Sequence, residues 1–204
     1  MDALTDWENY LHAGERDPVV QVAILKGQFE LIHPFLDGNG RVGRMLVPRI
    51  LSRKGVIGRP NFFISASIER DRDGYYDRLV GLSRARDWNG WIAFFLEKVI
   101  EQAEEDAGKA RAIQDLYHEM KYRFSEVTRS QFAVPAVDTL FARPVFTPPQ
   151  FATLSGIPKA SANRFLADLF LHDILVIRSE GRGRRATVNE FPELLRVVNG
   201  SPGE

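Results

Sequence analysis

The sequence contains no cysteine in its 204 residues, so disulfides, thiolate nucleophiles and cysteine-ligated metal sites are excluded. It also lacks any apolar run approaching the ~18 residues that a membrane-spanning helix needs. The N-terminal stretch MDALTDWENYLHAGERD carries acids where a signal peptide carries lysine or arginine. These absences predict a soluble, cytoplasmic protein with no membrane partner.

An excess of charge of one sign is also missing, because 27 Lys and Arg residues balance 27 Asp and Glu residues. Such a chain has no overall electrostatic attraction to nucleic acid or to an anionic membrane, so any basic site must be local. The length predicts one good-sized domain or two small ones, with a substantial core.

Apolar residues at helical spacing predict a mainly α fold. A core helix is predicted from Pro18, with apolar residues on nearly every side, and Pro34 ends it by forcing His33 out of the helical region. A long helix is predicted from Trp91 to about Val127. Another helix follows Gly40, and the stripe expected to face the core consists of Val42, Met45, Leu46 and Ile50.

Prolines at positions 135, 144, 148 and 149 predict a boundary between two domains. We expect a helical domain over residues 1–127, a linker over 128–147 and a small α+β domain over 148–204. The last segment is read as helix, turn, helix and hairpin, which is the order of a winged helix-turn-helix domain.

The stretch HPFLDGNGRVGR, residues 33–44, holds the strongest chemical signal. A helix that begins after Gly38, Asn39 and Gly40 presents unpaired N–H groups and the positive end of its dipole, and glycines let a phosphate approach closely. Arg41 and Arg44 lie three residues apart, so both guanidinium groups can reach the same anion. The stretch therefore predicts an anion cradle.

Two further residues of this stretch suit group transfer. Asp37 has the wrong charge for phosphate alone, but it fits a magnesium ion that bridges carboxylate and phosphate oxygens. His33 is placed to take a proton from an attacking hydroxyl. Each residue also has an ordinary reading as a helix end, a turn or a solvated charge. Together they cover the parts of a phosphoryl or nucleotidyl transfer site.

The stretch is similar to the motif of the Fic family, HPFx[DE]GNGRxxR, and matches it at every fixed position. The preceding QFELI, the pair Tyr75 and Tyr76, and the run DWNGWIAFFL are also similar to the family's pattern, up to about residue 105. The resemblance implies a helical domain that transfers AMP from ATP to a serine, threonine or tyrosine hydroxyl of a target protein.

The resemblance also implies roles by position. His33 would be the base and Asp37 the Mg²⁺ ligand, while Arg41 would help to neutralise the phosphates and Arg44 would contact the terminal one. The phosphates would be held by Gly38, Asn39 and Gly40. The wall of the adenine pocket would be formed by Tyr76, Leu79 and Ser83, for which plain core packing is an equal alternative.

Two family features are not found in this sequence: the hairpin flap that clamps the target peptide, and the inhibitory motif [ST]xxxE[GN]. We therefore expect an N-terminally shortened form, inactive or deregulated. Self-modification and a homodimer are further candidate partnerships. A different phosphate-containing donor is an alternative to ATP.

The C-terminal segment raises a second function, DNA binding. Near the start of its second helix, the residues expected to face the major groove are Lys159, Ser161, Asn163 and Arg164. At the hairpin tip, those expected to reach the backbone or minor groove are Arg182, Arg184 and Arg185. A protein-protein module is the alternative for this domain. For the whole chain, the alternative is a DNA-binding or adaptor protein whose Fic-like part is an inactive or regulatory nucleotide sensor.

Overall fold

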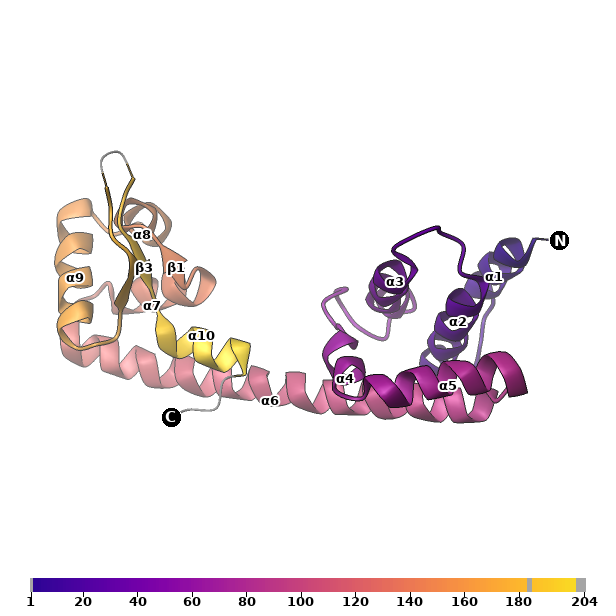
Figure 1. Ribbon diagram of the computed structural model, residues 1–204. Helices are drawn as coiled ribbons and strands as arrows, with labels where there is room; N and C mark the ends of the chain where they lie inside the picture. The colour runs from indigo at the N-terminus through magenta and orange to yellow at the C-terminus, as the bar shows by residue number, and fades with distance from the viewer. Residues whose placement is uncertain (1, 183–184, 201–204) are drawn as a thin grey trace. The chain divides into compact units, whose positions relative to one another are not determined.

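The computed structural model describes residues 2–182 and 185–200. These residues form helices α1 to α10 and one three-stranded sheet (Figure 1), so the predicted mainly α fold is confirmed. The chain divides into two compact units, Met1–Asp106 and Ala107–Glu204. Within the described residues, no helix combines the length and the apolar character needed to cross a membrane.

The N-terminal unit is entirely helical in the described residues. Its helices are α1 (Ala3–His12), α2 (Pro18–Ile32), α3 (Asn39–Arg53), α4 (Ser65–Arg70), α5 (Arg72–Ala85) and the first part of α6 (Trp88–Thr128). Asp17 caps α2 by accepting hydrogen bonds from the N–H groups of Val19 and Val20, and Pro18 occupies the first turn, where no N–H is needed.

Helix α2 is the centre of this unit, as its apolar sequence predicts. Two tryptophan indoles donate hydrogen bonds to its backbone: Trp7 of α1 to the Leu25 carbonyl at 2.8 Å, and Trp91 of α6 to the Ala23 carbonyl at 2.8 Å. A Cβ at Gly27 would lie 2.7 Å from Trp91 Nε1, so only glycine allows this approach. The two indoles therefore fix α2 between α1 and α6.

The C-terminal unit combines helices with the small sheet. Its elements after α6 are α7 (Ala133–Ala142), β1 (Val145–Phe146), α8 (Pro148–Ser155), α9 (Lys159–Leu171), β2 (Val176–Ser179), β3 (Val188–Glu190) and α10 (Pro192–Asn199). The strands lie in the order β1-β3-β2 and are antiparallel. Gly156 ends α8 in the left-handed conformation, with φ +66°. The aromatic residues buried in this core are Phe124, Phe146, Phe151, Phe165 and Phe191.

The segment 128–147 differs from the expected linker, because it contains α7 and β1 and the boundary between the units falls within α6. Ala136, Val137 and Leu140 of α7 are fully buried in the C-terminal core. Pro135 does not prevent this helix, since it lies in the first turn, where its missing N–H breaks no intrahelical hydrogen bond.

The expected apolar stripe of α3 is wrong at one position. Met45 is 62% exposed, whereas Val47 and Leu51 are buried. The buried face follows the contact of α3 with α2, where Gly43 lies directly against the α2 side chains. Met45 is two residues away from Gly43 and so lies on a different face of the helix.

Candidate functional site

His33 ends α2 in the left-handed conformation, with φ 50° and ψ 54°, and its N–H still donates to the Phe29 carbonyl at 3.1 Å. Pro34 disfavours a right-handed helical backbone at the residue before it, so the helix must stop here. The predicted end of the core helix is confirmed. The histidine side chain is exposed, at the start of the loop that leads to α3.

The side chain of Asn39 holds the loop between the two helices. Its Oδ1 accepts a hydrogen bond from the Phe35 N–H at 2.9 Å, and its Nδ2 donates to the Phe35 carbonyl at 2.5 Å. Asn39 is only 2% exposed. Its amide thus fixes the loop rather than facing solvent, and the part that Asn39 can offer to a phosphate is its backbone N–H at the start of α3.

Both motif arginines fold back over the N-terminus of α3. A Cβ at Gly38 would lie 3.5 Å from Arg41 Nη2, and one at Gly40 would lie 3.5 Å from Arg44 Nη1. Gly38 also has φ +86°, a conformation that glycine adopts without strain. The first N–H groups of α3 and two guanidinium groups therefore lie together, which is the arrangement that an oxyanion needs.

Asp37 lies at the edge of this arrangement. Its Oδ1 accepts from the Gly38 N–H at 2.6 Å, and its Oδ2 lies 3.5 Å from Arg41 Nη2. The Asp37 side chain is 94% exposed. The described residues contain no cluster of three acidic, histidine or cysteine side chains that could hold a metal ion by themselves. Asp37 therefore fits the common way of binding Mg²⁺, in which one carboxylate, the substrate phosphates and water molecules share the ion.

A buried polar network lies beneath the start of α3. Lys26 and Glu30 form an ion pair on α2, and Lys26 Nζ lies 3.2 Å from the hydroxyl of Tyr75 on α5. Burial lowers the pKa of Lys26, and Glu30 opposes that change. Burial and then Glu30 raise the pKa of Tyr75, whereas the nearby Arg44 lowers it. The network thus lies close enough to Arg44 to interact with it electrostatically.

Sequence reasoning missed this network. The signal that could have revealed it is the spacing of Lys26 and Glu30, four residues apart on a helix that is otherwise apolar. Their shared surroundings were not visible in the sequence, because Tyr75 is 49 residues away from Lys26.

The three residues expected at the adenine pocket have different surroundings. Tyr76 is half-exposed and packs edge-on against Tyr75 at 5.6 Å, with the Arg72 guanidinium 5.7 Å from its ring centre. Leu79 packs against the apolar core of the N-terminal unit, and Ser83 is exposed. Only Tyr76 is thus joined, through Tyr75, to the network beneath the motif.

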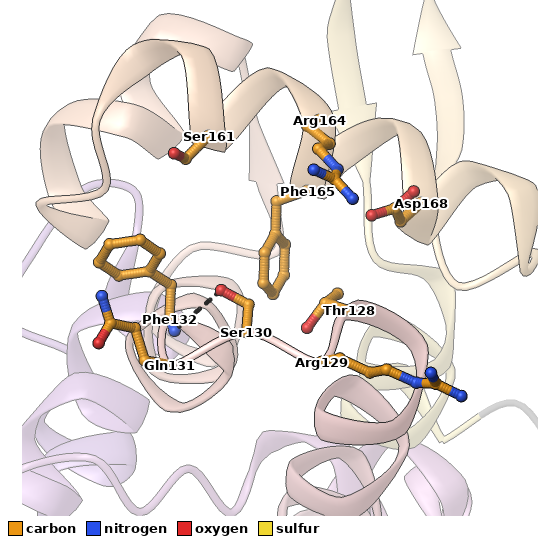
Figure 2. A pocket seen from close by; sticks show the side chains of 9 residues that line it. All are labelled: Thr128, Arg129, Ser130, Gln131, Phe132, Ser161, Arg164, Phe165 and Asp168. Carbon is orange, nitrogen blue, oxygen red and sulfur yellow. Dashed lines mark hydrogen bonds between the residues drawn. The ribbon is translucent and has the colours of Figure 1, made fainter.

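The residues expected to contact DNA do not form one surface on α9. Lys159 and Asn163 lie on one side of the helix, while Ser161 and Arg164 share another with Asp168 and line a cavity (Figure 2). Arg182 and Arg185 are exposed near the end of the hairpin, and Arg184 lies outside the described residues.

Comparison with known proteins agrees with the motif. Residues 1–51 match the Fic/DOC family, so the resemblance to the Fic family is confirmed for this part of the chain. The protein adenylyltransferase Fic of Drosophila willistoni is 38% identical over 103 residues, which are 50% of this chain and 20% of that protein. A probable protein adenylyltransferase of Aquifex aeolicus (strain VF5) is 51% identical over 41 residues, 20% of this chain and 13% of that protein.

The chain therefore spans a fifth or less of the length of these two relatives. Among solved structures, a Fic family protein from Desulfovibrio desulfuricans G20 aligns with 92% of this chain and 54% of its own, at 18% identity and a TM-score of 0.49.

Proposed function

We propose that the chain is a protein adenylyltransferase, which moves AMP from ATP to a hydroxyl side chain of a target protein. The observation that supports this most is the gathering of the Arg41 and Arg44 guanidinium groups over Gly38 and Gly40, at the N-terminus of a helix. A nucleotide's phosphates have the charge and the oxygen atoms that this arrangement can bind. The names of the relatives point to the same reaction.

In this proposal the target hydroxyl oxygen attacks the α-phosphorus of ATP, and the bond to the β,γ-phosphates breaks, so that pyrophosphate leaves. His33 accepts the hydroxyl proton as the new bond forms. Arg41 and Arg44, with the N–H groups of the first turn of α3, stabilise the charge on the phosphates. Asn39 keeps the loop in place through its two hydrogen bonds to Phe35.

Asp37 would hold a magnesium ion together with the phosphates. Bound there, the ion would neutralise part of their negative charge and polarise the phosphoryl oxygens. Because Asp37 is almost fully exposed and its partner Arg41 is weakly held at 3.5 Å, the carboxylate is free to turn to such an ion.

The test is label transfer. The purified chain is incubated with Mg²⁺ and with ATP labelled at the α- or the γ-phosphate, both alone and with a cell extract as a source of targets. The proposal expects protein-bound label from α-labelled ATP only, and none with His33→Ala. Label from γ-labelled ATP would show phosphoryl transfer, and the proposal would be wrong.

DNA binding by the C-terminal unit is a second candidate. After α6, this unit has the element order helix, strand, helix, helix, strand, strand, helix, and its first six elements follow the order of a winged helix-turn-helix domain. Lys159 and Asn163 are exposed on α9, the helix that would enter the major groove. The expected result is duplex binding that weakens with salt, persists in His33→Ala and is reduced by Lys159→Gln.

A further inference from the structure

The ion pair of Lys26 and Glu30 on α2 is buried beside the motif helix α3. The two side chains are only 2% and 10% exposed. Charged side chains are rarely buried this far unless they are paired. Even then the loss of hydration is so costly that apolar side chains of similar size are often as stable. Stability alone is therefore a weak reason for this pair, and its surroundings are the better guide to its role.

The pair lies directly against the backbone of α3. A Cβ at Gly43 would be 2.9 Å from Glu30 Oε1 and 3.0 Å from Lys26 Nζ. On the α5 side, the Tyr75 hydroxyl lies 3.2 Å from Lys26 Nζ, and the Tyr75 ring packs against Trp91 with 5.8 Å between the ring centres. The Glu30 carboxylate is thus enclosed by α2, α3 and α5, and among the described residues only Lys26 forms an ion pair with it.

Arg44, the residue after Gly43, lies close enough to act on both neighbours of Glu30. Burial is the main cause of the lowered pKa of Lys26 and Glu30 opposes it, but the charge of Arg44 lowers it further. Burial and then Glu30 raise the pKa of Tyr75, whereas Arg44 lowers it. Arg44 is exposed and forms no ion pair in the part of the chain that the structure describes. An unpaired cation therefore lies close to a buried carboxylate.

This arrangement creates a competition for Arg44. Without its lysine, Glu30 would be an uncompensated buried charge, which is strongly destabilising. It would attract the Arg44 guanidinium, and a guanidinium paired with Glu30 could not also contact a phosphate. Lys26 prevents this pairing, because its compact ammonium group satisfies the carboxylate from within the core.

We propose that Lys26 is a positioning residue: by neutralising Glu30 inside the protein, it keeps the Arg44 guanidinium free for the phosphates of the nucleotide. Lys26 does not touch the nucleotide and acts only through Glu30 and Arg44. This role rests on the nucleotide site proposed at the N-terminus of α3, but it belongs to a residue outside the 33–44 motif.

The test is calorimetric titration of the full chain with ATP in the presence of Mg²⁺. Lys26→Met keeps the length and the apolar stem of the side chain and removes its charge. It should weaken ATP binding about tenfold or more, as expected for a lost hydrogen bond between charged groups. Lys26→Gln leaves a hydrogen-bond donor for Glu30 but no charge, so it should weaken binding in the same direction, and it serves if the methionine variant does not fold. Circular dichroism checks the fold of each variant.

A second substitution gives a result that a purely structural role of Lys26 would not produce. The double variant Lys26→Met with Glu30→Gln has no buried carboxylate to capture Arg44, so its ATP affinity should return to within about threefold of that of the unmodified chain. In chains that already carry Arg44→Gln, Lys26→Met should change the affinity by less than about twofold, because its effect acts through Arg44. A long-range effect of the lost positive charge would persist in that background.

Lys98→Met is the matched control. Lys98 is another buried lysine of the N-terminal unit, but it pairs with Asp71 and Glu101 rather than with Glu30. Its substitution removes the same charge from a similar depth and should leave the ATP affinity unchanged.

The outcomes separate this role from the proposed function. An unmodified chain that binds no ATP would overturn the proposed function, and the role of Lys26 with it. If the unmodified chain binds ATP and Lys26→Met binds it equally well, only the role of Lys26 is wrong. The same conclusion follows if Glu30→Gln does not restore the affinity, if the loss persists in the Arg44→Gln background, or if Lys98→Met weakens ATP binding as much.

Discussion

His33 and Gly38 give the motif loop a left-handed backbone at both ends. For glycine this conformation is free of strain, but for histidine it costs free energy that other contacts must supply. Pro34 disfavours the right-handed alternative, and the two Asn39 hydrogen bonds to Phe35 hold the loop closed. Strain kept in this way at a residue with acid-base chemistry is typical of functional sites.

Asn39→Asp tests the loop at the scale of one residue. The aspartate can still accept from the Phe35 N–H, but it cannot donate to the Phe35 carbonyl and instead places a negative charge near that oxygen. We expect a loss of about 1–3 kcal/mol in the free energy of unfolding of the N-terminal unit, together with weaker ATP binding. Urea denaturation and ATP titration measure the two effects. An unchanged affinity for ATP would contradict the role given to the loop.

His33→Ala separates chemistry from binding. Since the proposed base acts on the target hydroxyl and not on the phosphates, the variant should lose AMP transfer while its ATP dissociation constant changes by less than about threefold. Filter binding and label transfer provide the two readouts. If ATP binding is lost as well, the histidine holds the nucleotide and the proposed role is wrong.

At the scale of elements, the site depends on how closely α2 and α3 pack. A Cβ at Gly43 would lie 2.9 Å from Glu30 Oε1, 3.0 Å from Lys26 Nζ and 3.2 Å from Phe29 Cδ1. Because these side chains are buried and two of them form an ion pair, they have little room to move. The glycine thus sets the distance between the helix that carries His33 and the helix that carries the arginines.

Gly43→Ala should therefore destabilise the N-terminal unit by about 1–3 kcal/mol through overpacking. Gly81→Ala on α5 is the matched control, because its nearest neighbour would be Asp87 Cβ at an ordinary 3.9 Å. The control should be stabilising by about 0.5–1 kcal/mol, the usual preference of a helix for alanine over glycine. Chemical denaturation compares the two. Similar effects of both substitutions would argue against a tight contact between α2 and α3.

The buried network predicts a dependence of stability on alkaline pH. The pKa of Tyr75 is raised above its usual value of 10, first by burial and then by Glu30. Above pH 10 the unfolded chain therefore loses a proton that the folded chain keeps, and stability falls as pH rises, by up to about 1.4 kcal/mol per pH unit. Below pH 10 the residue contributes no slope.

Tyr75→Phe removes this contribution. The free energy of unfolding of the variant should fall less steeply between pH 10 and 12 than that of the unmodified chain, while both have the same slope from pH 7 to 9. Denaturation curves at each pH provide the measurement. Lys26, whose lowered pKa acts in the opposite direction, is present in both proteins and so cancels to first order. Parallel curves above pH 10 would contradict the burial of the Tyr75 hydroxyl.

Sequence patterns predicted most helices of the N-terminal unit, but not the contacts between them. The core helix from Pro18 and its end before Pro34 follow from local rules about proline and apolar spacing. The helix predicted after Gly40 also forms, but it begins earlier, at Asn39. The exposure of Met45 could not be foreseen, because the buried face of α3 is chosen by its contact with α2. The same holds for the commitment of the Asn39 side chain to Phe35, which depends on the closed shape of the loop.

At the scale of the whole molecule, two separate cores explain why the boundary differs from the expected one. The prolines near position 144 lie where one element of the C-terminal unit ends and the next begins, not between the two units. The core of the C-terminal unit begins earlier in the chain, because it already includes Met120 and Phe124 of α6. A helix that continues across the division has no composition signal at that point. Single-sequence reasoning therefore could not place the boundary.

The central claim is that the N-terminus of α3 holds a nucleotide's phosphates within reach of His33. A crystal structure of the chain with ATP and Mg²⁺ tests this most directly. It should show phosphate oxygens contacting the N–H groups of the first turn of α3 and the guanidinium groups of Arg41 and Arg44, with the α-phosphate on the side of the His33 ring. Electron density for the nucleotide elsewhere, or a His33 ring turned away from the phosphates, would contradict the account.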